Sequence, residues 1–206
     1  MHIEPGILSS AKIAFANVAA VGMLAACAPA LLKRPALLLR TALAALFFSI
    51  FMQVFHLPVG ASELHFVGAM PIYLLLGFVP TLFGFAFGLL LQGLLFDPQD
   101  LAHLAVNSLS LMVPLAAVHY GLGKRLAGQF TVANIVKLDF AFYAGVTLMV
   151  GFWLSMGTEP TPLAARYLAL VLVEPLVTLA IVRAARGFKD SSWAQLCLDE
   201  RVTAAA

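Results

Sequence analysis

Charged residues are scarce in this chain, and their scarcity limits what it can be. Asp, Glu, Lys and Arg make up only 11% of its 206 residues, whereas 62% of the residues are hydrophobic. Soluble globular domains carry about 25% charged residues, so this composition excludes an ordinary soluble domain. The net charge of +2 is small, and no basic patch is interleaved with aromatic residues. We therefore expect no nucleic-acid partner.

Cysteine is rare, and the common catalytic motifs are missing. Cys27 lies in an apolar run and Cys197 in a different segment, so they form neither a metal-ligand cluster nor a convincing disulfide pair. The chain contains no Gly-x-x-x-x-Gly-Lys-Ser/Thr nucleotide loop and no His-Glu-x-x-His or Gly-x-Ser-x-Gly hydrolase motif. We therefore expect that the chain is not an enzyme and hydrolyses no ATP. Residues 1–10 also lack the pattern of a cleavable signal peptide.

What the chain has instead is a series of long apolar runs. An apolar helix of about 20 residues crosses the ~30 Å hydrocarbon core of a bilayer. The runs predict an all-α fold, a polytopic transmembrane helical bundle of about seven spans, near residues 10–31, 36–55, 65–79, 80–96, 102–122, 132–155 and 162–184. The third and fourth runs are short and meet at residues 77–80, which predicts a tight corner. We expect an integral membrane domain over residues 1–186 and a cytoplasmic C-terminal tail over residues 187–206.

Basic residues indicate how the chain is oriented in the membrane. They gather after the first, fifth and seventh expected spans, at Lys33, Arg34, Arg40, Lys124, Arg125, Arg183, Arg186 and Lys189. With an odd number of spans these clusters fall on one side, which is expected to be the cytoplasm. The N-terminus is then outside and the C-terminus cytoplasmic, in a multi-pass protein of the inner (plasma) membrane. Histidines and carboxylates on the outer side would attract divalent cations.

The first two residues form the strongest chemical motif. A free terminal amine, the amide of residue two and the imidazole of that residue can wrap a metal ion in fused chelate rings, and here these groups belong to Met1 and His2. His65, in the outer segment 58–68, can supply a fourth nitrogen. Four nitrogens in a plane suit Ni(II), Cu(II) and related Co(II) sites better than tetrahedral Zn(II). Because His2 is bulky, we expect Met1 to be retained.

Other polar residues can support such a site or serve the fold. Ser62 and Glu63 precede His65 and could orient it, as metal ligands usually require. Gln92 and Asn107 could brace the N-terminal segment in the same way, although hydrogen bonds between helices explain them equally well. The remaining outer histidines, His56 and His103, are expected to be solvated.

Some residues within the apolar spans point to helix contacts. Glu174, directly before Pro175, is expected to be a buried, hydrogen-bonded carboxyl at a kink, with a proton-coupled element as the alternative. Lys137 and Asp139 are expected to anchor the inner end of the sixth span at the membrane surface. The first span carries small residues at a spacing that lets another helix approach closely, although alanine is simply abundant in this chain: Ala16, Ala20, Gly22 and Ala26.

Four motifs together resemble a known family. In order along the chain they are Met-His-Ile-Glu-Pro-Gly at 1–6, Pro-Val-Gly-Ala-Ser-Glu-Leu-His-Phe-Val-Gly at 58–68, Leu-Gln-Gly-Leu-Leu-Phe at 91–96 with Asn107 after it, and Glu-Pro-Leu-Val-Thr at 174–178. They resemble the CbiM/NikM family, the cobalt- and nickel-capturing substrate-binding (S) components of energy-coupling factor (ECF) ABC transporters. The resemblance covers nearly the whole chain.

The resemblance implies a metal site and a set of partners. The implied ligands are the amine of Met1, the amide and imidazole of His2, and His65, holding Co(II) or Ni(II) as transported substrate without an organic cofactor. The implied partners are a transmembrane coupling subunit, which would meet the small-residue face of the first span, and two cytoplasmic ATPase subunits. The family's glycine-rich stretch reads Asp97-Pro-Gln-Asp100 here, which leaves the choice between nickel and cobalt open. Copper is not excluded by the ligand chemistry.

Two other classes of function remain compatible with the sequence. An S component for an organic vitamin would need a roomy polar and aromatic pocket on the outer side. A non-transport membrane metal sensor or enzyme would use His56, His65 and His103 as ligands, together with an open coordination position.

Overall fold

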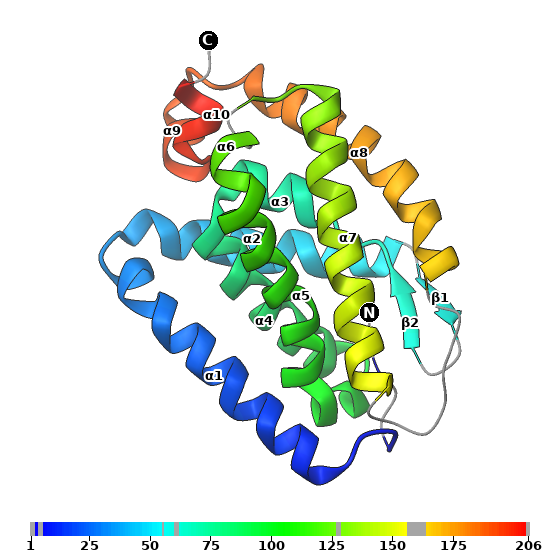
Figure 1. Cartoon of the computed structure of the whole chain (residues 1–206). Helices are drawn as coiled ribbons and strands as arrows, with labels where there is room; N and C mark the ends of the chain where they lie inside the picture. The colour runs from blue at the N-terminus through cyan, green and yellow to red at the C-terminus, as the bar shows by residue number, and fades with distance from the viewer. Residues whose placement is uncertain are drawn as a thin grey trace.

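The structure is a computed structural model, and it describes residue 3 and residues 6–54, 56–59, 62–126, 129–155 and 164–204. Side chains are described throughout these ranges except at 56–59, 62–64, 155, 164–172 and 204. Most of the described chain is helical (Figure 1), as the sequence predicted. One short antiparallel hairpin, which the apolar pattern did not predict, interrupts the helices: β1 (His56–Val59) pairs with β2 (Ser62–His65).

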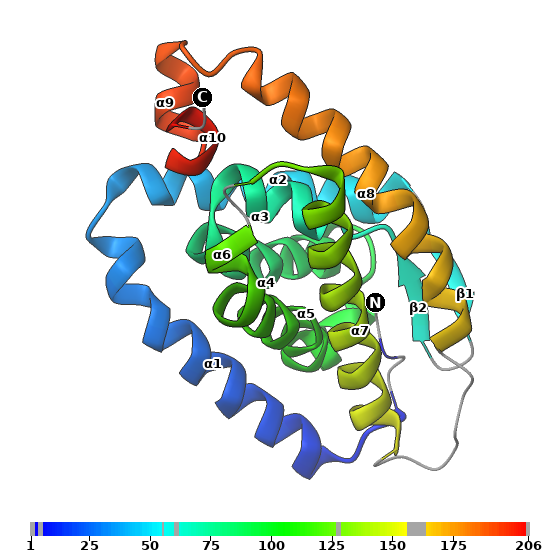
Figure 2. The same ribbon diagram turned by 45° about the horizontal axis from the view of Figure 1, so that its top comes forward.

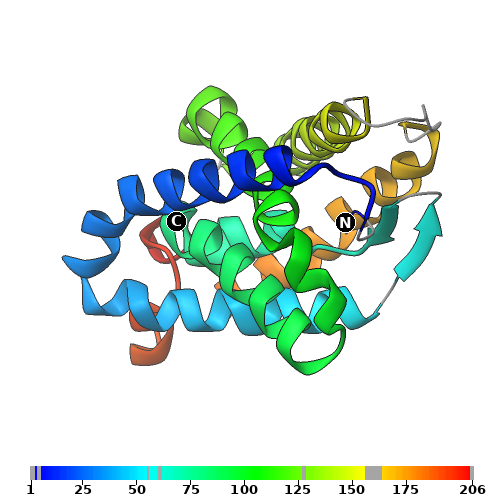
Figure 3. The ribbon, with the colours of Figure 1, turned by 90° about the horizontal axis from the view of Figure 1, so that it is seen from below.

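The helices follow one another with short connections. Their bounds are α1 (Ser10–Leu32), α2 (Pro35–Val54), α3 (Ala69–Leu76), α4 (Phe78–Leu95), η1 (Pro98–His103), α5 (Leu104–Val118), η2 (His119–Gly123), α6 (Lys124–Leu126), α7 (Val132–Ser155), α8 (Ala164–Arg186), α9 (Ser192–Cys197) and α10 (Glu200–Ala204). Figure 3 shows α1 and α2 running in opposite directions, with other helices between them over much of their length.

Five stretches of the described chain are long and apolar enough to cross a membrane: Ser10–Leu32, Pro35–Val54, Phe78–Leu95, Pro98–Leu126 and Val132–Leu154. They correspond to the first, second, fourth, fifth and sixth expected spans. α8 covers most of the seventh, and its 23 residues would extend about 35 Å at 1.5 Å per residue. The chain is therefore a helical membrane protein by the length and composition of its helices.

The third expected span, 65–79, is wrong as a single helix. Its residues divide between the end of β2, the linker 66–68 and α3, which has only 8 residues and so extends about 12 Å. Gly68 (φ +61°) precedes α3 and Gly77 (φ +93°) separates it from α4, so the expected corner at 77–80 is present. A continuous apolar run does not reveal where glycine turns divide it.

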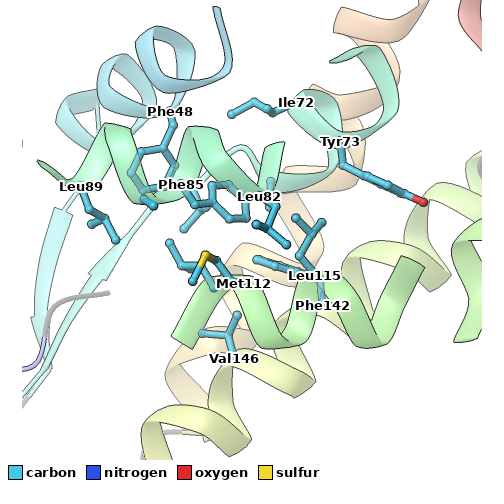
Figure 4. Close-up of a cluster of buried hydrophobic side chains, with 14 of the residues drawn as sticks. Phe48, Ile72, Tyr73, Leu82, Phe85, Leu89, Met112, Leu115, Phe142 and Val146 are labelled. Atoms are coloured by element: carbon cyan, nitrogen blue, oxygen red, sulfur yellow. The ribbon is translucent and has the colours of Figure 1, made fainter. Parts of the chain in front are cut away.

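The core lies between α2, α3, α4, α5 and α7. Figure 4 shows Phe48, Phe85, Met112 and Phe142 among the side chains that meet there, all of them almost completely buried. α4 approaches α2 closely because Gly84 and Gly88 carry no side chain. A Cβ at these positions would collide with Ala44 and Phe48. Small residues one turn apart are a common means of close helix packing in membranes.

The segment after α8 folds back onto the rest of the chain. The N–H of Asp199 donates to the carbonyl of Leu75, and Arg201 donates to the hydroxyl and the carbonyl of Tyr73. Nε of Arg40 donates to the carbonyl of Leu196 at 3.1 Å. α9 and α10 are thereby docked at one end of the bundle (Figure 2).

The basic clusters meet at that same end. Arg34, in the α1–α2 connection, lies 3.6 Å from Glu200 of α10. Tyr73, which Arg201 contacts, also hydrogen-bonds to His119 at the start of η2, one element before Lys124 and Arg125. Arg34, Arg40 and the segment next to Lys124 and Arg125 therefore lie at the same end of the folded chain.

The small-residue face of α1 is divided by the fold. Ala16 and Ala20 are buried within the chain itself, at 0% and 6% exposure, and α1 packs against α5, α2 and α4. They are therefore not available to a partner, which corrects the expected docking face. Gly22 and Ala26 are exposed, and a Cβ at Gly22 would meet nothing within 4 Å.

Candidate metal centre

His65 lies at the end of β2, with its side chain turned into the protein. Its imidazole is only 6% exposed, and in the hairpin it stands opposite His56. The Nδ1 atom lies 3.3 Å from the carbonyl oxygen of Met52. Because a carbonyl only accepts, this contact requires the tautomer with Nδ1 protonated, and Nε2 then carries the lone pair. Metal-binding histidines commonly show this arrangement.

The three residues after His65 are held tightly against α2. Phe66 meets Phe51 edge to face, with ring centroids 5.6 Å apart. Gly68 adopts a left-handed conformation, φ +61°, and the ring of Phe51 fills the space where a Cβ would lie. Only glycine satisfies both conditions easily. The turn that joins His65 to α3 is therefore rigidly defined.

The main chain of Ile3 is fixed from two sides by the start of α5. Its N–H donates to Oδ1 of Asn107 at 3.0 Å, and its carbonyl accepts from Nδ1 of His103 at 2.9 Å. All three residues are at most 1% exposed. The residue that directly follows His2 is thus clamped within the protein, and in Figure 3 the segment that precedes α1 turns back toward β2.

Asn107 lies where the bracing hypothesis placed it, whereas the expectation for His103 was wrong. His103 was expected to be solvated, yet it is 1% exposed and holds the N-terminal segment. The available signal was its spacing: His103 and Asn107 are one helical turn apart and so can share a helix face. Without knowledge of what packs against that face, the spacing did not identify a partner.

Gln92 forms hydrogen bonds between two helices instead of bracing the N-terminal segment. It accepts a hydrogen bond from Gln53 at 2.6 Å and donates to the carbonyl of Ser49 at 2.7 Å. These bonds join α4 to α2, so the alternative of a hydrogen bond between helices is correct. Gln92 therefore does not contact the N-terminal segment through these bonds.

Several predicted site residues lie outside the described part of the chain. Met1 and His2 are not described, and neither are the side chains of Ser62 and Glu63 on β2. Within the described residues, no three His, Cys, Asp or Glu side chains gather to hold a metal ion. The ligand set of Met1, His2 and His65 therefore remains a prediction. The structure describes the contacts of His65 and those of Ile3, the residue that follows His2.

A cavity of about 570 Å³ lies elsewhere, between α2, α3, α8 and α9. It is lined by apolar residues such as Phe47, Ile72 and Leu198, at the end where α9 docks. Its lining lacks the polar groups that would orient an organic vitamin.

Comparison with known proteins identifies the family. Residues 2–191 match the model of the family described as the cobalt uptake substrate-specific transmembrane region. Searches of curated proteins and of solved structures gave no match. The family match covers the helical bundle, the hairpin with His65 and the clamp on Ile3. The chain therefore belongs to the cobalt uptake substrate-specific transmembrane family, and it is a membrane component of cobalt uptake.

Proposed function

We propose that this chain captures Co(II) or Ni(II) on the outer side of the inner membrane and delivers it inward as the S component of an ECF importer. The ion is bound by the amine of Met1, the amide and imidazole of His2, and the imidazole of His65. The observation that carries this proposal is the clamp that Asn107 and His103 place on Ile3, directly after the proposed chelating residues.

The clamp matters because it acts on the peptide bond attached to His2. The N–H of Ile3 belongs to the His2–Ile3 peptide plane, and its hydrogen bond to Asn107 restrains that plane. The bond from His103 restrains the next peptide plane. A flexible chain start would lose much conformational entropy on wrapping an ion, and a start already held loses less. Preorganisation of this kind supports tight metal capture.

His65 is prepared for the fourth position by its own support. The hydrogen bond to Met52 selects the tautomer that leaves a lone pair on Nε2. The turn at Gly68 and the packing of Phe51 hold the segment that carries it. We therefore propose Nε2 as the coordinating atom. Ser62 and Glu63 remain candidates for orienting it from β2.

Delivery of the ion requires energy that this chain does not supply. It has no nucleotide-binding loop, so we propose that it is not an enzyme and that two cytoplasmic ATPase subunits act through a transmembrane coupling subunit. The basic residues gathered at one end support a cytoplasmic C-terminus and an outer N-terminus. The exposed Gly22 and Ala26 remain the part of the α1 face that can meet the coupling subunit.

The test is metal binding by the full chain and by four variants. One carries an added glycine before Met1, and the others are His2→Ala, His65→Ala and His56→Ala. We expect the extension, His2→Ala and His65→Ala each to abolish tight binding, measured by titration calorimetry with Co(II) and Ni(II). His56→Ala is the matched control, because His56 pairs with His65 in the hairpin register and is not a proposed ligand.

The outcomes separate the ligand set from the transport role. Tight binding by the extended chain would contradict the assignment of the Met1 amine. Loss of binding in His56→Ala alone would point to a histidine site in the hairpin. The transport role is tested with vesicles that contain this chain, the coupling subunit and ATPase subunits made inactive by mutation. If the ATPase subunits supply the energy, these vesicles should take up no ⁵⁷Co.

A further inference from the structure

Four polar side chains lie at the interface of α7 and α8, and the proposed metal centre uses none of them. Asp139 and Tyr143 are one turn apart on α7, and Glu174 and Thr178 are one turn apart on α8. Three of them are 0% exposed and Tyr143 is 1% exposed. Asp139 therefore does not anchor a helix end at the membrane surface, which corrects the sequence expectation. The expectation of a buried, hydrogen-bonded Glu174 is confirmed.

Glu174 is well supplied with hydrogen-bond donors. The hydroxyl of Tyr143 donates to Oε2, and the N–H of Met70 donates to Oε1 at 3.4 Å. Met70 is the second residue of α3, so the positive N-terminal end of that helix faces the carboxyl group. These donors and this dipole stabilise a negative charge on Glu174.

Asp139 has the opposite surroundings. Neither Oδ1 nor Oδ2 has a hydrogen-bond partner among the described residues. Asp139 lies one helical turn from Tyr143, whose hydroxyl donates to Glu174, so negative charges on both carboxyl groups would repel each other. A charged Asp inside a transmembrane helix bundle is costly, and an unpaired charge beside a like charge is costlier still. An ionised Asp139 is therefore the state that the site disfavours most.

Thr178 is a second buried polar group at this interface. Its hydroxyl is fully buried and has no hydrogen-bond partner within the described chain. α7 and α8 run in opposite directions, as Figures 1 and 2 show, and Tyr143 faces Glu174 across the interface. In antiparallel helices, one turn back on α7 is level with one turn forward on α8. Asp139 and Thr178 are therefore level with each other.

We propose that Asp139 and Glu174 form an intramembrane proton-binding site, with the proton on Asp139, the negative charge on Glu174 and the hydroxyl of Thr178 beside the protonated group. One bound proton reduces the pair from two negative charges to one. It also gives Asp139 an O–H group, which can donate a hydrogen bond to the hydroxyl oxygen of Thr178. Two carboxyl groups that share a site share protons in this way.

Among the side chains that the structure describes on the elements around Asp139 and Glu174, no basic residue lies next to the two carboxyl groups. α3 carries no charged residue, and its one titratable side chain is Tyr73. α5 carries no charged residue between Leu104 and Val118. On α7 the nearest cation is Lys137, which is exposed and lies two positions from Asp139, on another side of the helix. α8 carries three basic residues: Arg166, near its beginning and eight positions before Glu174, and Arg183 and Arg186 in its last turn. The side chain of Arg166 lies outside the described part of the chain.

Infrared spectroscopy of the full chain in lipid nanodiscs tests the proposal without any metal. A protonated carboxylic acid has a C=O band separate from that of a carboxylate. At neutral pH we expect such a band in the native chain and its complete loss in Asp139→Asn, which is isosteric with the neutral acid. The band should remain in Asp97→Asn, the same substitution at an exposed position. It should remain but shift in Thr178→Val, because a neighbouring hydroxyl is removed.

Other results would overturn the proposal. The native chain could lack the band at neutral pH, or the band could survive in Asp139→Asn. A sodium or potassium ion in place of the proton would leave only carboxylate bands and would make the unfolding temperature depend on the concentration of that ion. If the Asp139→Asn variant does not fold, the Thr178→Val variant tests the proposal instead. A carboxylic-acid C=O band at the native frequency in that variant would contradict the placement of Thr178 beside the protonated acid. Because no readout involves cobalt, failure here leaves the proposed metal function untouched.

Discussion

Asn107 accepts a hydrogen bond from the main chain of Ile3, a residue 104 positions earlier in the sequence. This bond and the one from His103 connect the beginning of the chain to the start of α5. The family match makes the chain a component of cobalt uptake, and the proposed ligands Met1 and His2 directly precede Ile3. The predictions below therefore begin with this clamp.

Asn107→Leu should weaken cobalt binding by about 10–100-fold, the range typical for loss of an outer-shell support. The substitution removes the acceptor of the Ile3 N–H and leaves that buried group without a partner. Asn107→Asp keeps an acceptor oxygen at the same place and should retain more of the affinity. Titration calorimetry on the purified chain distinguishes the two. Equal cobalt affinities of the Asn107→Leu and Asn107→Asp variants would show that the hydrogen bond to Ile3 does not contribute to metal binding.

His103→Ala should weaken cobalt binding in the same direction, because the carbonyl of Ile3 loses its donor. The side-chain amide of Asn can place an N–H near the position of Nδ1, so His103→Asn should recover part of the loss. The contrast separates a clamp from a metal ligand, because a ligand imidazole is not replaced by an amide. If the His103→Ala and His103→Asn variants lose cobalt binding equally, His103 would be a direct ligand of the ion.

Gly68→Ala should destabilise the protein by at least about 1–2 kcal/mol, the cost of a left-handed conformation in a residue with a Cβ, and should displace His65. The added Cβ also meets the ring of Phe51. The readouts are the thermal unfolding midpoint in detergent and the cobalt affinity. Gly22→Ala is the control, since that position is helical and open. A Gly68→Ala protein with native stability and affinity would contradict the role assigned to the turn.

Gly88→Val should separate α4 from α2, because the new side chain collides with Phe48 and the carbonyl of Ala45. Overpacking of this kind costs about 1–3 kcal/mol. The hydrogen bonds of Gln92 to Gln53 and Ser49 lie about one turn further along α4 and should weaken as well. Gly151→Val, at a helical position with nothing within 4 Å, should have little effect. Unfolding midpoints of both variants provide the comparison.

Cobalt affinity should fall as the pH is lowered from about 8 to about 6. Binding needs the terminal amine and the imidazoles in their unprotonated forms, and their reference pKa values are about 7.7–8.0 and about 6.5. Protons then compete with the ion, so acid weakens binding. Calorimetry in buffers of different ionisation enthalpy measures the protons released. An affinity that stays constant over this interval would exclude the amine from the ligand set.

The helical spans could be predicted because the bilayer imposes them. Hydrocarbon satisfies no backbone hydrogen bonds, so a long apolar run must form them internally as a helix. The runs at 10–31, 36–55, 80–96 and 132–155 accordingly match α1, α2, α4 and α7. The run at 65–79 failed, since Gly68 and Gly77 divide it by local conformation rather than by hydropathy.

The site was only partly accessible from the sequence. Motif order indicated Met1, His2 and His65 and suggested Asn107, but the clamping role of His103 depends on a contact between residues 100 positions apart. The same holds for Gln92, whose partners on α2 explain it without any metal, and for Asp139, whose burial reverses the surface role expected of it.

The amino acids alone determined that this protein is a helical membrane chain, and they predicted that its first two residues chelate a metal, since hydropathy and donor chemistry are local properties of residues. Tertiary structure alone decided which groups hold Ile3 in place, which small residues of α1 are buried within the chain, and which carboxyl groups are buried at one helix interface. Those outcomes depend on helix register and on distances between remote segments. No local pattern carries that information.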